Sequence, residues 1–138
     1  MKLDTFMVAE AASAADGKLF IHGGGLTQVT PPVLPWVHPQ LALVARVEVS
    51  EGEEAIDHTL TMHFTGPDGE EALPPAEVLL PASDMPERRE GRAIYALAVL
   101  TLAGVPLDQV GTYRFSIDID GTEAGWERIH VYEPGETP

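Results

Sequence analysis

A glycine-rich segment near the start of the chain has the composition of a catalytic loop. His22-Gly23-Gly24-Gly25 has the form of a loop whose backbone amides stabilise an oxyanion during acyl transfer. That chemistry also needs a serine on a sharp Gly-x-Ser-x-Gly elbow, and no serine of the chain stands in that pattern. We therefore predict a bulge or turn that another backbone approaches closely, and a protein that is not an enzyme.

The histidines are spaced unfavourably for a metal site. The chain contains five histidines and no cysteine, so thiolate sites are excluded. His58 and His63 lie five residues apart on one expected strand, which places them on opposite faces. Since they cannot share an ion, we predict no metal and no cofactor.

Carboxylates near residue 120 look like part of a calcium loop. Asp118, Asp120 and Glu123 surround Gly121, but the third alternating carboxylate of a complete loop is absent. A strand that leads into a hairpin turn explains the same residues. A calcium site stays open as an alternative if the acidic stretch around residues 51–57 comes near.

Two tryptophans stand beside expected loops. Trp36 and Trp126 could stack on a sugar ring or contact a protein partner, although tryptophans in such places more often close the core. They are the candidate ligand or partner contacts of the chain.

Charge narrows the range of partners. The chain carries 22 acidic against 8 basic residues, a formal charge of −14. Such a protein repels phosphate backbones and anionic lipids, so we expect no nucleic acid and no membrane as partners. No apolar run has the length of a membrane span or a signal core, and the lack of cysteine fits a reducing compartment. We expect a cytoplasmic protein.

Alternation of apolar and polar residues predicts strands. It is clearest in three segments, 41–49, 59–65 and 112–119, where every second residue is apolar. Segment 94–102 is apolar on both faces, which favours a central strand, with a short buried helix as the alternative. Weaker strands are expected at 3–9, 18–22, 26–29, 78–80 and 126–132.

Turn residues between these segments predict antiparallel pairing. Asp16-Gly17, Asp68-Gly69 and Asp120-Gly121 suit tight hairpins. We expect a mobile hairpin loop at 50–57. The whole pattern predicts an all-β, antiparallel two-sheet β-sandwich with little or no helix, formed by one domain over 1–132 and a flexible tail over 133–138.

A tyrosine near the end of the chain favours an immunoglobulin-like sandwich. Asp108, Gly111 and Tyr113 open an expected strand much as a tyrosine corner does, although the spacing is one residue longer than in that motif.

The opening of the chain resembles a family of short uncharacterised bacterial and phage proteins. The resemblance is carried by Leu3-Asp4-Thr5-Phe6-Met7-Val8-Ala9-Glu10-Ala11-Ala12 and by Asp16-Gly17-Lys18-Leu19-Phe20-Ile21-His22-Gly23-Gly24-Gly25. It covers nearly the whole chain and departs from the family at Glu10, where aspartate is expected. It implies a stand-alone domain of the cytoplasm or of phage-related gene sets, and no catalytic residue.

Taken together, the residues favour a non-enzymatic binding or accessory domain. We expect it to present loops or a free sheet edge to a protein partner or to a second copy of itself. The alternative from another class is a module that binds sugar or calcium. A hydrolase that uses residues 22–25 is the third hypothesis.

Overall fold

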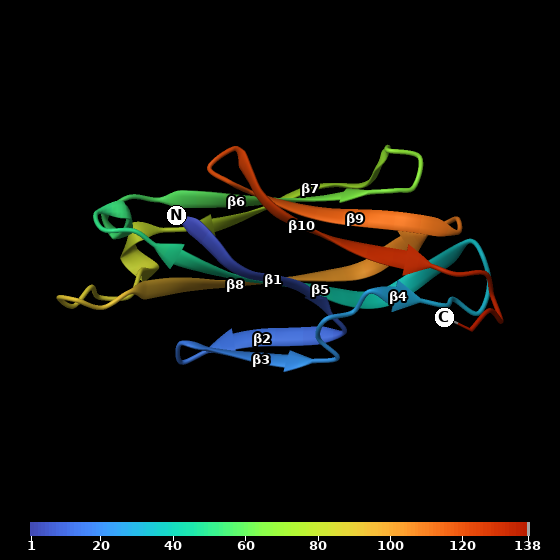
Figure 1. Ribbon diagram of the computed structural model, residues 1–138, viewed down its shortest axis with the longest axis horizontal. Helices are drawn as coiled ribbons and strands as arrows, with labels where there is room; N and C mark the ends of the chain where they lie inside the picture. Colours follow the sequence, from blue (N-terminus) through green and yellow to red (C-terminus); the bar gives the residue numbers. More distant parts are fainter. Residues whose placement is uncertain (138) are drawn as a thin grey trace.

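Backbone pairing arranges the chain in three layers (Figure 1). The computed structural model describes residues 1–137. One layer is a five-stranded sheet of order β4-β10-β9-β6-β7, the middle layer is a three-stranded sheet of order β1-β5-β8, and the outer layer is the β2–β3 hairpin. The strands are β1 Lys2–Ala9, β2 Ala11–Ala15, β3 Lys18–His22, β4 Gln28–Val29, β5 Trp36–Val49, β6 His58–Thr65, β7 Glu71–Leu80, β8 Ile94–Leu107, β9 Gly111–Ile119 and β10 Thr122–Val131.

The predicted all-β architecture is confirmed. Within residues 1–137 the helical segments are two 3-10 turns of three residues each, Glu53–Ala55 and Ala82–Asp84. Neither comes near the length that crossing a membrane as a helix would need.

The main core lies between the two larger sheets. Alternation on β6 and β9 points one side chain in two inward, so Leu60, Phe64 and Phe115 are buried while the residues between them face outward. Burial of these apolar side chains supplies most of the driving force for packing the sheets. The strong alternation in the sequence is therefore the signature of this interface.

A second, smaller core lies between the middle layer and the hairpin. It is formed by Ala9, Ala42 and Val44, with partly buried residues of β2, β3 and β8 packed against it. Strand β5 is thus covered on both faces, which explains why Leu41–Ala45 is buried without interruption. The prediction of a two-sheet sandwich is incomplete, because the alternation of apolar and polar residues does not predict the third layer.

Three details of the predicted topology are wrong. Segment 94–102 is the strand that we expected, but β8 lies at the edge of its sheet and owes its second covered face to the hairpin. Strand β4 pairs with β10 in parallel, whereas we expected antiparallel pairing throughout. Residues 50–57 connect strands of different sheets, so they form a crossing between layers and no hairpin loop.

Two of the three predicted Asp-Gly turns are tight two-residue turns, whereas Asp68-Gly69 lies in the longer connection 66–70 between β6 and β7, where Gly69 alone has a positive φ, 85°. Asp16 and Gly17 have φ of 54° and 70°, and Asp120 and Gly121 have φ of 50° and 85°. Two consecutive positive φ values are those of the turn type that matches the twist of a two-residue hairpin. Turn chemistry therefore sets the β2–β3 and β9–β10 registers.

The chain end beyond β10 starts with a turn, in which the amide of Glu136 donates to the carbonyl of Glu133 at 2.9 Å. The tail expected over 133–138 includes Pro138, which lies outside the described residues.

Tyr113 closes the connection between β8 and β9. Its hydroxyl donates to the carbonyl of Gln109 at 3.2 Å and accepts from the amides of Asp108 and Gln109 at 3.0 and 3.2 Å. The side chain is buried, so these bonds are shielded from water. The corner-like role that the sequence predicts for Tyr113 is thus present in its contacts.

We expect Tyr113→Phe to lower the free energy of unfolding by about 1–3 kcal/mol, because a part-buried carbonyl and two part-buried amides lose their partner. Urea unfolding monitored by tryptophan fluorescence would measure it. Tyr132→Phe is the matched control, since the Tyr132 hydroxyl makes no hydrogen bond within residues 1–137. Equal losses in the two variants would contradict the corner role.

Candidate functional site

An apolar groove runs along the free edge of β8. Its floor is Tyr95–Val99 of β8, and its walls are the hairpin turn at 14–17, the end of β7 at 78–80 and the segment 81–86. We call it the β8 groove; its volume is about 530 Å³. It opens on the side of the molecule where β7 and β8 end their respective sheets.

The edge strand in this groove is unprotected. Within residues 1–137, β8 pairs only with β5, so alternate backbone groups on its other side point away from any strand. Edge strands are usually blunted by charge, proline or a bulge, as β7 is by Pro74 and Pro75. Residues 95–99 carry neither charge nor proline. Leu79 of β7, 61% exposed, adds apolar surface beside them.

The charges of the β8 groove all have one sign. Among its lining residues the charged ones are Asp16 on the hairpin turn and Asp84 in the second 3-10 turn, both exposed. The groove therefore combines an apolar floor with negative walls, within a chain of formal charge −14.

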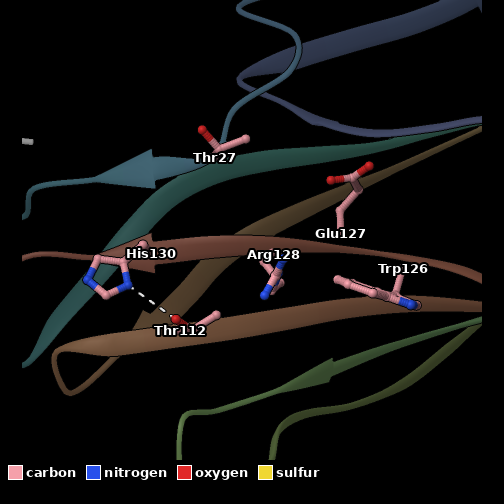
Figure 2. A pocket seen from close by; sticks show the side chains of 6 residues that line it. All are labelled: Thr27, Thr112, Trp126, Glu127, Arg128 and His130. Atoms are coloured by element: carbon pink, nitrogen blue, oxygen red, sulfur yellow. Dashed lines mark hydrogen bonds between the residues drawn. The ribbon is translucent and has the colours of Figure 1, made fainter.

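A second depression surrounds Trp126 at the opposite side of the five-stranded sheet. Figure 2 shows its six lining residues, which we call the Trp126 surface; its volume is about 550 Å³. They are Thr27, Thr112, Trp126, Glu127, Arg128 and His130. Thr27 precedes β4, Thr112 lies on β9, and the remaining four lie on β10.

Two guanidinium groups lie over the Trp126 ring. The Cζ atoms of Arg114 and Arg128 are 5.1 and 5.0 Å from the ring centroid, within the range of a cation–π contact. Arg114 also pairs with Glu123 at 3.0 Å. Within residues 1–137, Arg128 forms no ion pair with a carboxylate. Beside them, Thr112 Oγ1 lies 3.2 Å from His130 Nδ1 (Figure 2).

The two predicted contact tryptophans have different positions. Trp126 is 46% exposed and lies on the outer face of β10. Trp36 starts β5, pairs with Leu107 of β8 and packs against the main core. The structure therefore separates them, and Trp126 lines a depression.

The three weak calcium candidates bind three different groups. Asp118 pairs with His63 at 2.9 Å, Asp120 with His58 at 2.6 Å, and Glu123 with Arg114. Asp118 and Glu123 are cross-strand neighbours, but their side chains have separate partners. Among residues 1–137, no group of three or more histidine and carboxylate side chains is placed to hold a metal ion.

His58 is a buried histidine that forms an ion pair with Asp120. Its Nδ1 faces Asp120 Oδ2 at 2.6 Å and its Nε2 faces the carbonyl of Glu53 at 2.8 Å. Burial lowers the pKa of His58, but the bonds to Asp120 and Glu53 outweigh it and raise the pKa above its ordinary value. Both neighbours are acceptors, so a ring protonated on both nitrogens satisfies each of them. His63 points to the other face of β6, as its spacing from His58 predicts.

The glycine-rich segment 22–25 is a close backbone contact, as predicted. The amide of Glu10 donates to the carbonyls of His22 and Gly23 at 3.1 and 3.2 Å. A Cβ on Gly23 would lie 2.7 Å from the Glu10 side chain, and Gly23 has φ of 62°. The glycines thus serve the junction between β1 and the hairpin.

Comparison with known proteins identifies a family and a solved structure to which the chain is similar. A family described as "Family of unknown function (DUF6941)" matches residues 4–132. Curated proteins offer no significant match. Among solved structures, the crystal structure of the C-terminal domain of wzt is similar with 15% identity and a TM-score of 0.47, over 95% of this chain and 72% of that one. Because the family match covers residues 4–132, the chain belongs to the DUF6941 family, whose function is unknown.

Proposed function

We propose that the protein is a non-enzymatic binding domain that receives an extended segment of a partner protein in the β8 groove. The observation that carries this function is the unprotected edge at 95–99, flanked by apolar residues of β7 and by the hairpin turn. A peptide that adds as a strand to such an edge gains backbone hydrogen bonds, and its alternate side chains fill the groove.

The charges of the groove favour a particular partner. Asp16 and Asp84 attract a lysine or arginine of an otherwise apolar, alternating segment. A second copy of this chain would bring the same two carboxylates and a formal charge of −14 to the contact. Repulsion between like charges therefore makes a basic, apolar strand the better occupant than self-pairing.

Selection of short random peptides on the immobilised protein would test this function. Enriched peptides should alternate apolar residues and carry a basic residue. Bound peptide should also slow hydrogen exchange of backbone amides within 95–99, because they gain strand partners.

We expect Leu79→Lys to weaken binding of such a peptide at least about tenfold, since it removes apolar surface and repels the basic residue. Val37→Lys is the matched control: both side chains are 61% exposed, and Val37 lies at the other end of the β5–β8 ladder. Isothermal titration calorimetry measures both. Equal affinities of the two variants, or a wild-type dimer that Leu79→Lys dissolves, would overturn the proposed partner.

For the fold, we further propose the immunoglobulin-like class of sandwich. It is supported by the hydrogen bonds of Tyr113 to Gln109 and Asp108, which are those of a tyrosine corner.

A further inference from the structure

Two arginines, Arg114 and Arg128, lie against Trp126 on a strongly acidic chain. Arg114 and Arg128 are direct cross-strand partners between β9 and β10. Like charges in this position destabilise a sheet unless something compensates them. The ring of Trp126 contacts both guanidinium groups and offsets their repulsion, whereas Glu123 pairs with Arg114 and not with Arg128. Arg128 is left exposed, oriented by the indole, and without a carboxylate within residues 1–137.

A ligand carboxylate would supply the partner that Arg128 lacks. The guanidinium group is a planar fork that matches a carboxylate with two parallel hydrogen bonds. Stacking on Trp126 restricts its orientation, so less freedom is lost when the anion binds.

The other lining residues suit hydroxyl groups and a ring. Thr27 and Thr112 offer hydroxyls that donate and accept, whereas Glu127 points to the other face of β10. Trp126 adds partly exposed apolar surface at one end of the depression (Figure 2). Glu127 and the formal charge of −14 also oppose a ligand with several negative charges.

From these groups we infer that the Trp126 surface binds an acidic sugar, a hydroxylated ring with one carboxylate. Arg128 holds the carboxylate, Thr27 and Thr112 bond the hydroxyls, and the indole contacts the ring. This site is separate from the β8 groove, because β10 and β7 lie at opposite sides of the five-stranded sheet.

Three probes separate the contributions of the ring and the charge. In NMR titrations, D-glucuronate should shift the indole N–H signal of Trp126, which the Trp36→Phe variant assigns. D-Glucose has the same ring without the carboxylate, and acetate has the carboxylate without the ring. We expect glucuronate to bind at least about tenfold more tightly than either.

Variants locate the contact. Arg128→Gln should weaken glucuronate binding at least about tenfold and leave it no tighter than glucose. Arg89→Gln makes the same change of charge on an exposed residue outside the site and should leave the affinity unchanged. The acidic-sugar site is overturned if the indole signal does not move, if glucose or acetate binds as tightly as glucuronate, or if Arg128→Gln binds like wild type.

Discussion

Phe115→Ala is expected to lower the free energy of unfolding by about 3–5 kcal/mol, the largest effect of any single substitution considered for this chain. Phe115 is fully buried on β9 and faces the main core. Its ring stacks on Phe64 with centroids 4.3 Å apart, and Phe64 stacks in turn on Tyr113 at 5.3 Å. Removing the ring leaves a cavity and ends a chain of aromatic contacts between β9 and β6.

Guanidinium chloride unfolding at constant pH measures this loss. Phe20→Ala is the matched control, because Phe20 lies on β3 with 56% of its surface exposed. Its effect should stay within about 0.5 kcal/mol. A loss for Phe115→Ala no larger than that of Phe20→Ala would show that the main core lies elsewhere.

His58→Gln is expected to destabilise the protein by about 1–2 kcal/mol near pH 6 and by less at pH 9. The pKa of His58 is raised in the folded state, so its stabilising contribution is fully present below the unfolded pKa of about 6.5 and is lost as pH rises through the folded pKa. The pKa of Asp120 is lowered although burial opposes this, because His58 and the amide of Thr59 bond its carboxylate. The ionised form of Asp120 is therefore favoured by its bonds to His58 and Thr59.

The size of this effect is limited by solvent. Asp120 is 46% exposed, so water screens the ion pair and places the loss in the lower part of the range for charged hydrogen bonds. Unfolding curves at several pH values, wild type against variant, measure the difference. His22→Gln makes the same change at an exposed histidine and is the matched control. A His58→Gln difference that grows above pH 7 would contradict the assigned charge state.

The strands could be predicted where one face is buried and the other is wet. Segments 59–65 and 112–119 alternate cleanly because β6 and β9 each turn an apolar face to the core and a polar face outward, although Ser116 on the outer face of β9 is also buried. The strand β2 was missed, because Ala11–Ala15 consists of small residues without alternation. The parallel pairing of Gln28 with His130 joins residues far apart in the chain, and no local pattern encodes it.

The candidate sites were less visible in the sequence than the fold. Trp126 was identified, and Arg128 two residues later lies on the same face of a strand, a spacing that could have found the pair. That Arg114 also lies at Trp126 could not be predicted without the β9–β10 register. The likeness of residues 118–123 to a calcium loop was not a sign of a metal site. Asp118 and Asp120 pair with His63 and His58 of β6, and these pairs follow from the β6–β9 register, which the sequence does not show. The β8 groove depends on three layers, and the sequence predicted two.

The small size of the hairpin's contact has a consequence for how the molecule opens. Within residues 1–137 the β2–β3 hairpin pairs with no other strand, and it packs on a small cluster built around Ala9, Ala42 and Val44. A two-stranded hairpin is marginal alone, so its detachment takes far less free energy than global unfolding. The hairpin turn is also one wall of the β8 groove. We therefore expect this wall of the β8 groove to open locally while both larger sheets stay folded, so that the width of the groove can change.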